Sequence, residues 1–324
     1  MNMNIAVPPK PKSALPLIAR ILSNDLAQKI LSPLEKLTRS NLMVSDGADI
    51  IKTDKLDKKL LKDFFENRIL AIHIPGFCSK EIAEITANNV LKKEISNWYI
   101  GDVKKQYKQS DVEVFGTPFN LAVKNNKSWE NYFLGAKKLS DELRDLSHPN
   151  QYPLDKFRLE IDEIWPDGMI TNTFQGAKMV PGLVRVMHEK IQKSADIPLS
   201  CHVDSVPILL KNKGKFSVNI YLKTPSVGGN LYIWDTKLSG LKEFFSKWYV
   251  VNNFFMQSNY LDEEIQRSFQ SMLPKPKEIR IEQGDVVLLN TGRPHAITSF
   301  SGGPRVSLQA FITYEKDKTL KIWA

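Results

Sequence analysis

In the first half of the chain, apolar positions recur at the spacing of a helix that buries one face. Ser79 is a suitable N-cap for one of these helices, because Glu81 follows it in the first turn. The stripes indicate packing against a core and do not by themselves indicate cofactor sites. We predict helices over residues 16–40 (one or two short ones), 56–66, 79–91, 129–146 and 154–165.

A different pattern appears at residues 69–74, where an apolar run closed by Pro75-Gly76 predicts a buried strand and a turn. From about residue 170 onward, short alternating or β-branched-rich runs are separated by Gly and Pro. Many short strands with turn signals between them predict a sandwich or barrel, with a jelly roll as the natural candidate. We predict strands at 112–115, 182–188, 216–223, 231–234, 278–282, 285–290, 295–299 and 305–314.

Two regions follow from this change of pattern. We expect residues 1–165 to form an N-terminal helical region with a leading strand at about 69–74, packed on a core formed by residues 166–324 in a single structural unit. Residues 241–273 interrupt that core with a helical, aromatic-rich insert. A long excursion inside a β-domain is often a lid or a binding element. The insert is therefore our candidate lid.

Charge and cysteine content narrow the class of protein. The formal net charge of +9 comes from Lys and Arg spread along the whole chain, which favours a basic soluble protein over a nucleic-acid-binding one. Cys78 and Cys201 are not at metal-site spacing, so we expect buried thiols in a reducing compartment. The sequence has neither a secretory signal nor an apolar run long enough to span a bilayer. We expect a cytoplasmic protein without nucleic-acid or membrane partners, and the oligomeric state stays open.

The tripeptide His202-Val-Asp204 is the first candidate for chemistry. In an extended segment, residues two apart point to the same side, so one imidazole and one carboxylate can face one ion. His295 lies far along the chain and could supply a third ligand from a neighbouring strand. Two histidines and one carboxylate leave the opposite face of the ion open, which suits iron(II), because the ion must also bind an oxidant and a co-substrate.

Arg305 follows His295 by ten residues and lies in an otherwise apolar strand. A buried arginine normally has an anionic partner, and a guanidinium can pair with a carboxylate through two hydrogen bonds. Ser307, two residues further on, can add a hydroxyl donor on the same side. This pair predicts a carboxylate-binding position near the metal.

Taken together, His202-x-Asp204, the Gly228-to-Trp234 hairpin, Gly284-Asp285, His295 and Arg305-x-Ser307 resemble the iron(II)/2-oxoglutarate dioxygenases over about residues 170–314. The stretch at 69–95 is similar to the strand and helix that precede the core in the prolyl-hydroxylase-like branch. The resemblance implies a mainly β fold with helical additions, namely a double-stranded β-helix (jelly-roll, cupin-like) core with N-terminal helices packed on it.

The resemblance also implies a chemistry. The cofactors would be Fe(2+), 2-oxoglutarate and O2, with the far carboxylate of 2-oxoglutarate bound by Arg305 and Ser307. Decarboxylation to succinate and carbon dioxide would accompany hydroxylation of an unactivated C–H bond in a small molecule, such as an amino acid or a natural-product intermediate. The layout is also similar to the carrier-independent halogenases, in which Gly or Ala replaces the acidic ligand so that chloride can bind. Because this chain keeps Asp204, we predict hydroxylation instead of halogenation.

Several further residues are weaker candidates. Asn219 and Tyr221 share one face of their predicted strand, and either could bond the co-substrate carboxylate. Arg185 is expected either to enter the barrel mouth and meet 2-oxoglutarate or an anionic substrate, or to face outward. Trp234 and Phe311 are expected as walls of the core or of the substrate pocket. Arg293, close to His295, is expected to be solvated.

Alternative functions remain open at this point. The same chemistry could act on a protein or a nucleic acid, or the reaction could be a desaturation or cyclisation of a small molecule. A non-catalytic cupin-like binding protein is a more remote alternative, because the sequence contains a complete set of ligands together with Arg305.

Overall fold

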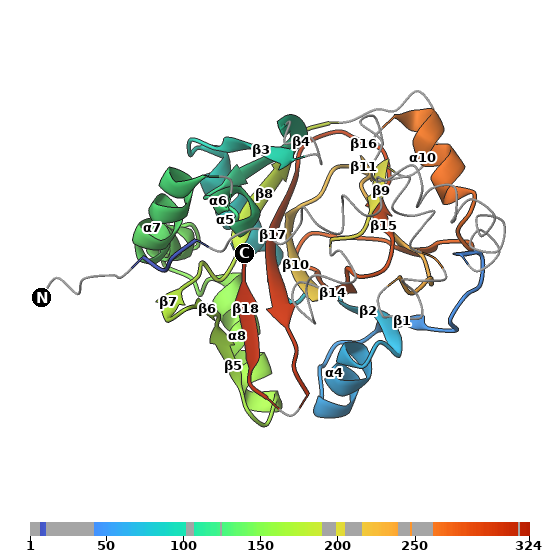
Figure 1. Cartoon of the computed structure of the whole chain (residues 1–324), viewed down its shortest axis with the longest axis horizontal. Coiled ribbons are helices and arrows are strands. Elements are labelled where there is room, and N and C mark those ends of the chain that lie inside the picture. The colour runs from blue at the N-terminus through green and yellow to red at the C-terminus, as the bar shows by residue number, and fades with distance from the viewer. Residues whose placement is uncertain are drawn as a thin grey trace, which may run out of the picture.

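A computed structural model describes residues 7–10, 42–101, 107–123, 125–189, 199–204, 216–238, 247, 262–316 and 318–324 of the chain. The helices predicted at 16–40 lie outside these residues, as does most of the 241–273 insert. The described part is rich in strands, with helices concentrated on one side of the larger sheet (Figure 1). Within the described residues, no helix is long and apolar enough to cross a membrane.

The larger sheet has ten strands and runs in the order β1-β2-β14-β10-β17-β8-β4-β3, with β18 beside β17 and β5 beside β18. Antiparallel pairing joins β2 to β14 and β4 to β8, so strands from both sides of residue 165 share one sheet. The strands are β1 (Asp49–Lys52), β2 (Ile69–Ile74), β3 (Ser96–Gly101), β4 (Tyr107–Phe115), β5 (Met169–Thr171), β8 (Leu183–Met187), β10 (Phe216–Lys223), β14 (Val286–Asn290), β17 (Arg305–Thr313) and β18 (Leu320–Trp323).

The smaller sheet has four strands in the order β13-β12-β15-β9, and two short two-stranded ribbons pair β11 with β16 and β6 with β7. An apolar cluster joins residues of the larger sheet, such as Tyr221 and Leu289, to residues of the smaller sheet, such as Leu231 and Ile233. The two sheets therefore face each other across this cluster. The remaining strands are β6 (Thr173–Phe174), β7 (Ala177–Lys178), β9 (Leu199–His202), β11 (Val227–Gly228), β12 (Leu231–Ile233), β13 (Lys277–Ile279), β15 (His295–Ile297) and β16 (Phe300–Ser301).

The helices between residues 58 and 164 carry their apolar stripes to the main core on the other face of the larger sheet, where residues such as Phe64 and Phe157 are fully buried. Phe269 of the last helix packs in a separate cluster with Trp234. Ser79 caps its helix as predicted, because its hydroxyl accepts a hydrogen bond from the amide of Ile82. The helices are α4 (Lys58–Phe65), α5 (Lys80–Leu91), α6 (Phe119–Ala122), α7 (Asn126–Asp145), α8 (Pro153–Ile164) and α10 (Glu263–Gln270).

The predicted elements that fall on described residues are confirmed in type, from the strand at 69–74 to the strand at 305–314. Sequence reasoning missed β1, β3 and β18, and it placed the start of β4 five residues too late. These strands have weak local signals, because β1 has four residues and is mostly exposed, and β3 contains Ser, Asn and Gly. Pairing with neighbouring strands makes them extended.

Candidate metal centre and co-substrate site

His202, Asp204 and His295 meet at the edge of the smaller sheet, where β9 and β15 pair. His202 lies directly opposite His295 in the ladder, and the centroids of the two imidazole rings are 4.4 Å apart. The amide of Asp204 donates to the carbonyl of Thr291 at 3.0 Å, so the chain after β9 stays beside the turn before β15. One ligand atom from each of the three side chains lies within 4.8 Å of the others, close enough to hold one metal ion.

Alternation along β9 explains why two of these residues face the same way. Cys201 is fully buried in an apolar cluster with Trp234 and Phe269. His202 points to the other side of the sheet, and Asp204, two residues further on, joins it. The side chains of His202 and Asp204 are 40% and 17% exposed, so the ion position opens toward solvent or substrate.

Backbone carbonyls orient both imidazole rings. Nδ1 of His202 lies 2.6 Å from the carbonyl oxygen of Ser200, and Nδ1 of His295 lies 3.0 Å from that of Arg293. If each Nδ1–H donates to its carbonyl, each Nε2 keeps its lone pair for a metal, which is the usual arrangement around bound ions. The buried Oδ2 of Asp204 has no hydrogen-bond partner among the described residues. This donor set fits a divalent transition metal such as iron(II).

The pKa values of the triad follow from its crowding. Burial, together with the nearby charge of His202, lowers the pKa of His295 to about 4. For Asp204, burial acts to raise the pKa, but the hydrogen bond from His202 and the charge of His295 outweigh it and lower it to about 2. Burial acts to lower the pKa of His202. The hydrogen bond to Asp204 and the negative charge of that carboxylate outweigh burial, so the pKa of His202 is raised. Asp204 is therefore ionised and His295 is neutral near neutral pH, as ligands must be.

Gln266 on α10 supports the strand that carries His202. Its side-chain oxygen accepts from the amide of Cys201 at 2.8 Å, and its side-chain nitrogen donates to the carbonyl of Cys201 at 3.3 Å. The side chain is 1% exposed. Gln266 thus satisfies the open edge of β9 in the way a neighbouring strand would. Sequence reasoning missed this role, because nothing near residue 266 indicates which backbone it meets.

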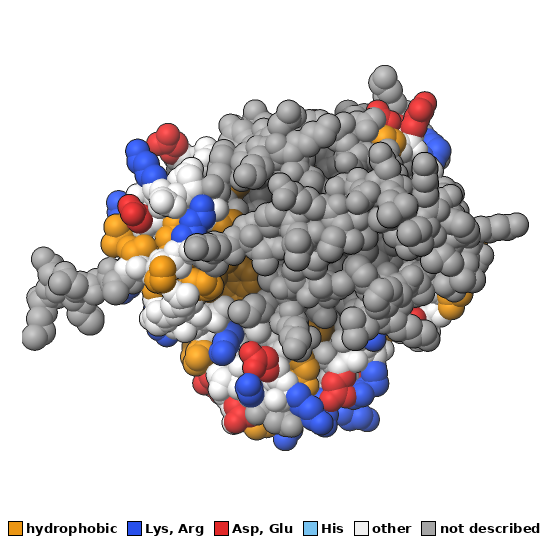
Figure 2. Space-filling view, in the orientation of Figure 1, with side chains coloured by type: hydrophobic (Ala, Val, Ile, Leu, Met, Phe, Trp, Pro, Cys, Tyr) orange, Lys and Arg blue, Asp and Glu red, His pale blue; other side chains and the backbone are white. Residues whose placement is uncertain are grey.

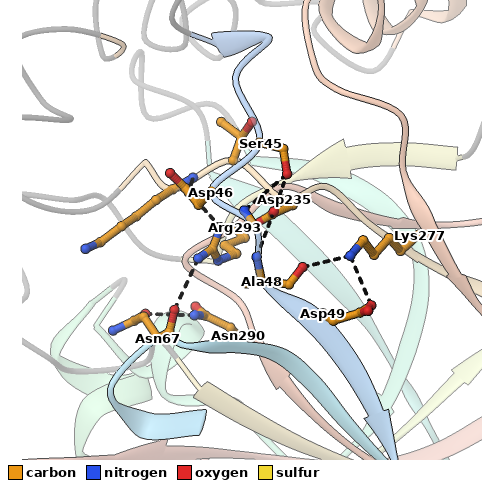
Figure 3. Close-up of polar contacts among 12 residues, drawn as sticks. Ser45, Asp46, Ala48, Asp49, Asn67, Asp235, Lys277, Asn290 and Arg293 are labelled. Atoms are coloured by element: carbon orange, nitrogen blue, oxygen red, sulfur yellow. Dashed lines mark hydrogen bonds and ion pairs between the residues drawn. The ribbon is translucent and has the colours of Figure 1, made fainter. Parts of the chain in front are cut away.

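The expectation that Arg293 is solvated is wrong. Its side chain is 2% exposed, and Nη1 donates to Asp235 at 2.7 Å and to Asp46 at 2.9 Å (Figure 3). Asp235 also accepts from the amide of Ala48 at 3.0 Å and from the hydroxyl of Ser45. Acidic partners far away in the sequence allow the guanidinium to be buried. Because the carbonyl of Arg293 holds His295, this network anchors the backbone of one candidate metal ligand.

Arg305 lies on the face of β17 that is turned toward the smaller sheet. It is 7% exposed, and its guanidinium lies 4.9 Å from the centroid of the Tyr221 ring and 3.8 Å from the sulfur of Met187. Ser307 is directly opposite Tyr221 in the β10–β17 ladder, so their side chains share this face. Within the described part of the chain, no carboxylate pairs with Arg305, and its Nε has no hydrogen-bond partner. A buried cation in this state fits a ligand carboxylate, as 2-oxoglutarate provides.

The weaker polar candidates also lie on this inner face. Asn219 is opposite Gln309 and donates to the hydroxyl of Ser217 at 3.1 Å. Arg185 on β8 is opposite Ser307, so it faces inward, and the outward alternative is wrong. The structure thus brings Arg305, Ser307, Tyr221, Asn219 and Arg185 onto one surface.

The two aromatic candidates for the substrate pocket lie elsewhere. Ile233 is opposite His295, so Trp234, the next residue, turns to the other side of the smaller sheet and packs against Phe269. Phe311 stands at the far end of β17 from Arg305 and packs against Trp323, with ring centroids 5.2 Å apart. Neither ring is placed beside the triad. Both fit the alternative role as walls of the core.

A cavity of about 750 Å³ runs along α8 and β5, bordered by residues such as Arg144, Tyr152 and Arg158. In Figure 1 these elements lie on the opposite side of the molecule from β9 and β15. The cavity contains none of the triad residues, so we do not assign the chemistry to it.

A comparison with solved structures found chains of similar fold. An N-substituted L-amino acid dioxygenase from Burkholderia ambifaria AMMD matches 82% of this chain and 91% of its own, with 14% identity and a TM-score of 0.51. A structure of such a dioxygenase in complex with α-ketoglutarate, from the same organism, matches 82% of this chain and 90% of its own, with 12% identity and a TM-score of 0.48. An oxidoreductase of the 2OG-Fe(II) oxygenase family from Burkholderia pseudomallei matches 81% and 93%, with 12% identity and a TM-score of 0.35.

No protein-family model matches the sequence, and no curated protein matches it. At 14% identity, the first likeness speaks for the fold, and the argument about chemistry has to come from the residues of the site. The chain has a fold similar to that of the N-substituted L-amino acid dioxygenase.

Proposed function

We propose that this protein is an iron(II)/2-oxoglutarate-dependent oxygenase that hydroxylates an unactivated C–H bond of a small molecule. One observation carries the proposal. Two imidazoles with carbonyl-bonded Nδ1 atoms converge with Oδ2 of Asp204, which has no hydrogen-bond partner among the described residues, on the side of the smaller sheet that faces Arg305. We further propose that the two facing sheets form the core of a double-stranded β-helix.

Each residue has a distinct task in this proposal. His202, Asp204 and His295 hold the ion on one side and leave its other positions open. Arg305 pairs with the far carboxylate of 2-oxoglutarate, while Ser307 and the hydroxyl of Tyr221 offer further hydrogen bonds. The bound metal and co-substrate supply the oxidising power. The chain supplies the position, because the buried wall around Arg305 keeps water from competing for the carboxylate.

Asp204 favours hydroxylation over halogenation. Halide transfer needs an open metal position where this carboxylate lies, and the amide of Asp204 is bonded to Thr291 at 3.0 Å. The backbone therefore keeps the carboxylate beside the two histidines. Desaturation and cyclisation remain alternative outcomes of the same oxidation.

A small molecule is the proposed substrate, either an amino acid derivative or a natural-product intermediate. The fold match to an N-substituted L-amino acid dioxygenase supports the first of these. On the described part of the face in Figure 2, Lys and Arg side chains alternate with Asp and Glu around α4 and α8. Such a mixed surface favours a small molecule over a polyanion.

The direct test is turnover of 2-oxoglutarate by the iron-loaded protein. We expect succinate to form when iron(II), 2-oxoglutarate and oxygen are all present, and a visible metal-to-ligand charge-transfer band to form without oxygen. The matched control is the same protein loaded with zinc, which binds the triad but is redox-inactive. A protein that binds iron(II) yet gives neither succinate nor the band across varied substrates is not such an enzyme.

A further inference from the structure

His73 and Asp285 form a buried pair on the inner face of the larger sheet. His73 on β2 is directly opposite Val287 on β14, and Val287 belongs to the apolar cluster between the two sheets. Opposite residues in an antiparallel pair point to the same side, so His73 points toward the smaller sheet. Its Nε2 lies 2.8 Å from Oδ2 of Asp285, and the two side chains are 8% and 4% exposed. The proposed metal and co-substrate ligands include neither residue.

The carboxylate of Asp285 holds the turn that leads into β14. Oδ2 also accepts from the amide of Glu282 at 2.9 Å, and Oδ1 accepts from the amide of Gly76 at 2.9 Å. Burial acts to raise the pKa of Asp285, but the hydrogen bonds with His73 and with the two amides outweigh burial and lower the pKa. The ionised carboxylate therefore ties the end of β2 to the turn before β14.

This turn bonds directly to the backbone of Tyr221 on β10. The amide of Tyr221 donates to the carbonyl of Asp285 at 2.9 Å, and the amide of Gly284 donates to the carbonyl of Tyr221 at 2.8 Å. Two successive residues thus oppose one residue, which is the pattern of a β-bulge. Gly284 permits this pattern, because its φ is +93° and a Cβ there would lie 2.2 Å from the carbonyl oxygen of Cys78.

The pairing on the other side of Tyr221 is also irregular. Tyr221 is opposite Ser307 in the β10–β17 ladder, and the register shifts before Lys223, which is opposite Val306. Bulges bend a strand, increase its twist and redirect the side chains beside them. The direction of the Tyr221 side chain therefore depends on the turn that Asp285 holds.

Tyr221 connects this turn to the proposed co-substrate site. Its side chain is buried, and the guanidinium of Arg305 lies 4.9 Å from the centroid of its ring. The strands β2, β14, β10 and β17 are consecutive neighbours in the sheet (Figure 1). His73, Asp285, Tyr221 and Arg305 thus form one continuous row of contacts across these four strands.

We propose that Asp285, held by His73, is a positioning residue that sets the Tyr221 side chain against Arg305 and thereby controls the affinity for 2-oxoglutarate. This inference rests on the proposed function. A pair that served stability alone would change the free energy of unfolding without changing co-substrate affinity, so the two roles are separable by experiment.

Calorimetric titration of 2-oxoglutarate into the manganese(II)-loaded full-length protein measures the dissociation constant without turnover. Asp285→Asn keeps the size of the side chain and removes its charge, and we expect it to raise this constant about tenfold. Manganese(II) affinity should stay within about twofold, because no proposed metal ligand is altered. With iron(II) and oxygen, the KM for 2-oxoglutarate should rise by a similar factor, while kcat for succinate formation stays within about twofold.

Variants of His73 test the hydrogen bond and serve if Asp285→Asn does not fold. His73→Leu removes the ring nitrogen and should raise the dissociation constant about fivefold. His73→Gln keeps a nitrogen donor at a similar reach and should stay within about twofold of the parent. In a Tyr221→Leu background the ring is missing, so adding Asp285→Asn should change the constant by less than about twofold.

Thr86→Val is the matched control. Thr86 is buried on α5, and its hydroxyl lies 2.8 Å from that of Ser147, outside the proposed site. Denaturant unfolding should show lower stability in this variant, while its affinity for 2-oxoglutarate stays within about twofold of the parent.

Two outcomes overturn the inference and leave the proposed function intact. Unchanged 2-oxoglutarate affinity in folded Asp285→Asn and His73→Leu, with stability lowered as in Thr86→Val, makes the pair structural only. An equal effect of Asp285→Asn with and without the Tyr221 ring rejects the route through Tyr221. A parent protein that binds the metal but not 2-oxoglutarate rejects the proposed function itself, and the inference with it.

Discussion

Gln266 and Cys201 are joined by two hydrogen bonds, of 2.8 and 3.3 Å, between the amide side chain of one and the backbone of the other. Cys201 immediately precedes the candidate metal ligand His202, and the opposite edge of this strand pairs with β15. Among the described residues, the strand that carries His202 is therefore bonded on one side to β15 and on the other to the side chain of Gln266 on α10. The helix that belongs to the candidate lid thus bonds to the strand of the candidate metal centre through Gln266.

Gln266→Leu removes both bonds while keeping the side chain apolar and similar in size. We expect metal affinity to fall about tenfold, because residues that position ligands typically contribute at this level. Competition titration with a metal indicator measures the effect. Ser268→Ala, on the exposed side of the same helix, is the control and should leave affinity unchanged. An equal loss in both variants would mean that helix stability, and not the bond to β9, is responsible.

Arg305→Gln should weaken 2-oxoglutarate binding by roughly ten- to a hundredfold, because a charge-assisted contact contributes about 1.5–3 kcal/mol. Titration of the charge-transfer band measures the dissociation constant. Iron(II) affinity should stay within about twofold, since Arg305 is not a ligand in the proposed site. Unchanged 2-oxoglutarate affinity would transfer the role to another cation, and Arg185 is the first to examine.

Asp204→Ala should lower metal affinity at least about a hundredfold, because it removes the only carboxylate of the triad and leaves two neutral ligands. Equilibrium dialysis with manganese(II) measures the change without relying on turnover. Asp167→Ala, which alters an exposed carboxylate, is the matched control. Asp204→Gly with added chloride separately tests whether the site can transfer halogen. Undiminished metal affinity in Asp204→Ala would remove this residue from the ligand set.

Metal affinity should depend on pH through one histidine. The pKa of His202 is raised above its usual value by Asp204, whereas that of His295 is lowered to about 4. Below the pKa of His202 the metal must displace one proton, so affinity should fall about tenfold per pH unit. Above about pH 4, His295 is already neutral and adds nothing to the slope. Proton release on nickel(II) binding, measured near pH 5.5, should be one per ion, and a value of two would contradict this account.

Asp235→Ala should destabilise the fold by about 3–5 kcal/mol, because it leaves the guanidinium of Arg293 buried with less negative charge. Denaturant unfolding measures the difference. The exposed pair Lys277–Asp49, visible in Figure 3, is the control: Asp49→Ala should cost less than about 1 kcal/mol. Similar losses from both substitutions would mean that burial does not distinguish the two ion pairs.

The sequence was sufficient to predict that His202 and Asp204 face the same way, because they need only an extended backbone, and the structure places His295 beside them. The shared face of Arg305 and Ser307 was predictable for the same reason. The surroundings of these residues were not, since they depend on strand register and on distant partners. Trp234 faces away from the site because its neighbour Ile233 is opposite His295. Which side of the sheet Trp234 faces becomes known only when the pairing of β12 with β15 is known.

The burial of Arg293 also depends on partners that its local sequence does not indicate. Its local sequence, Gly292-Arg-Pro, is typical of a solvated turn. Asp46 and Asp235 lie far from Arg293 along the chain, yet their ion pairs with the guanidinium offset the cost of burying its charge. No periodicity or motif near residue 293 indicates these two ion pairs. The sequence therefore predicted that the side chain of Arg293 faces solvent.

The contact between Arg293 and Asp46 joins residues 247 positions apart, and it supports the turn that carries His295. A centre built from such distant segments can form only after most of the chain has been synthesised. While the chain is still emerging from the ribosome, a metal ion would meet His202 and Asp204 without their third partner. The proposed metal site would therefore be completed late in the maturation of this protein.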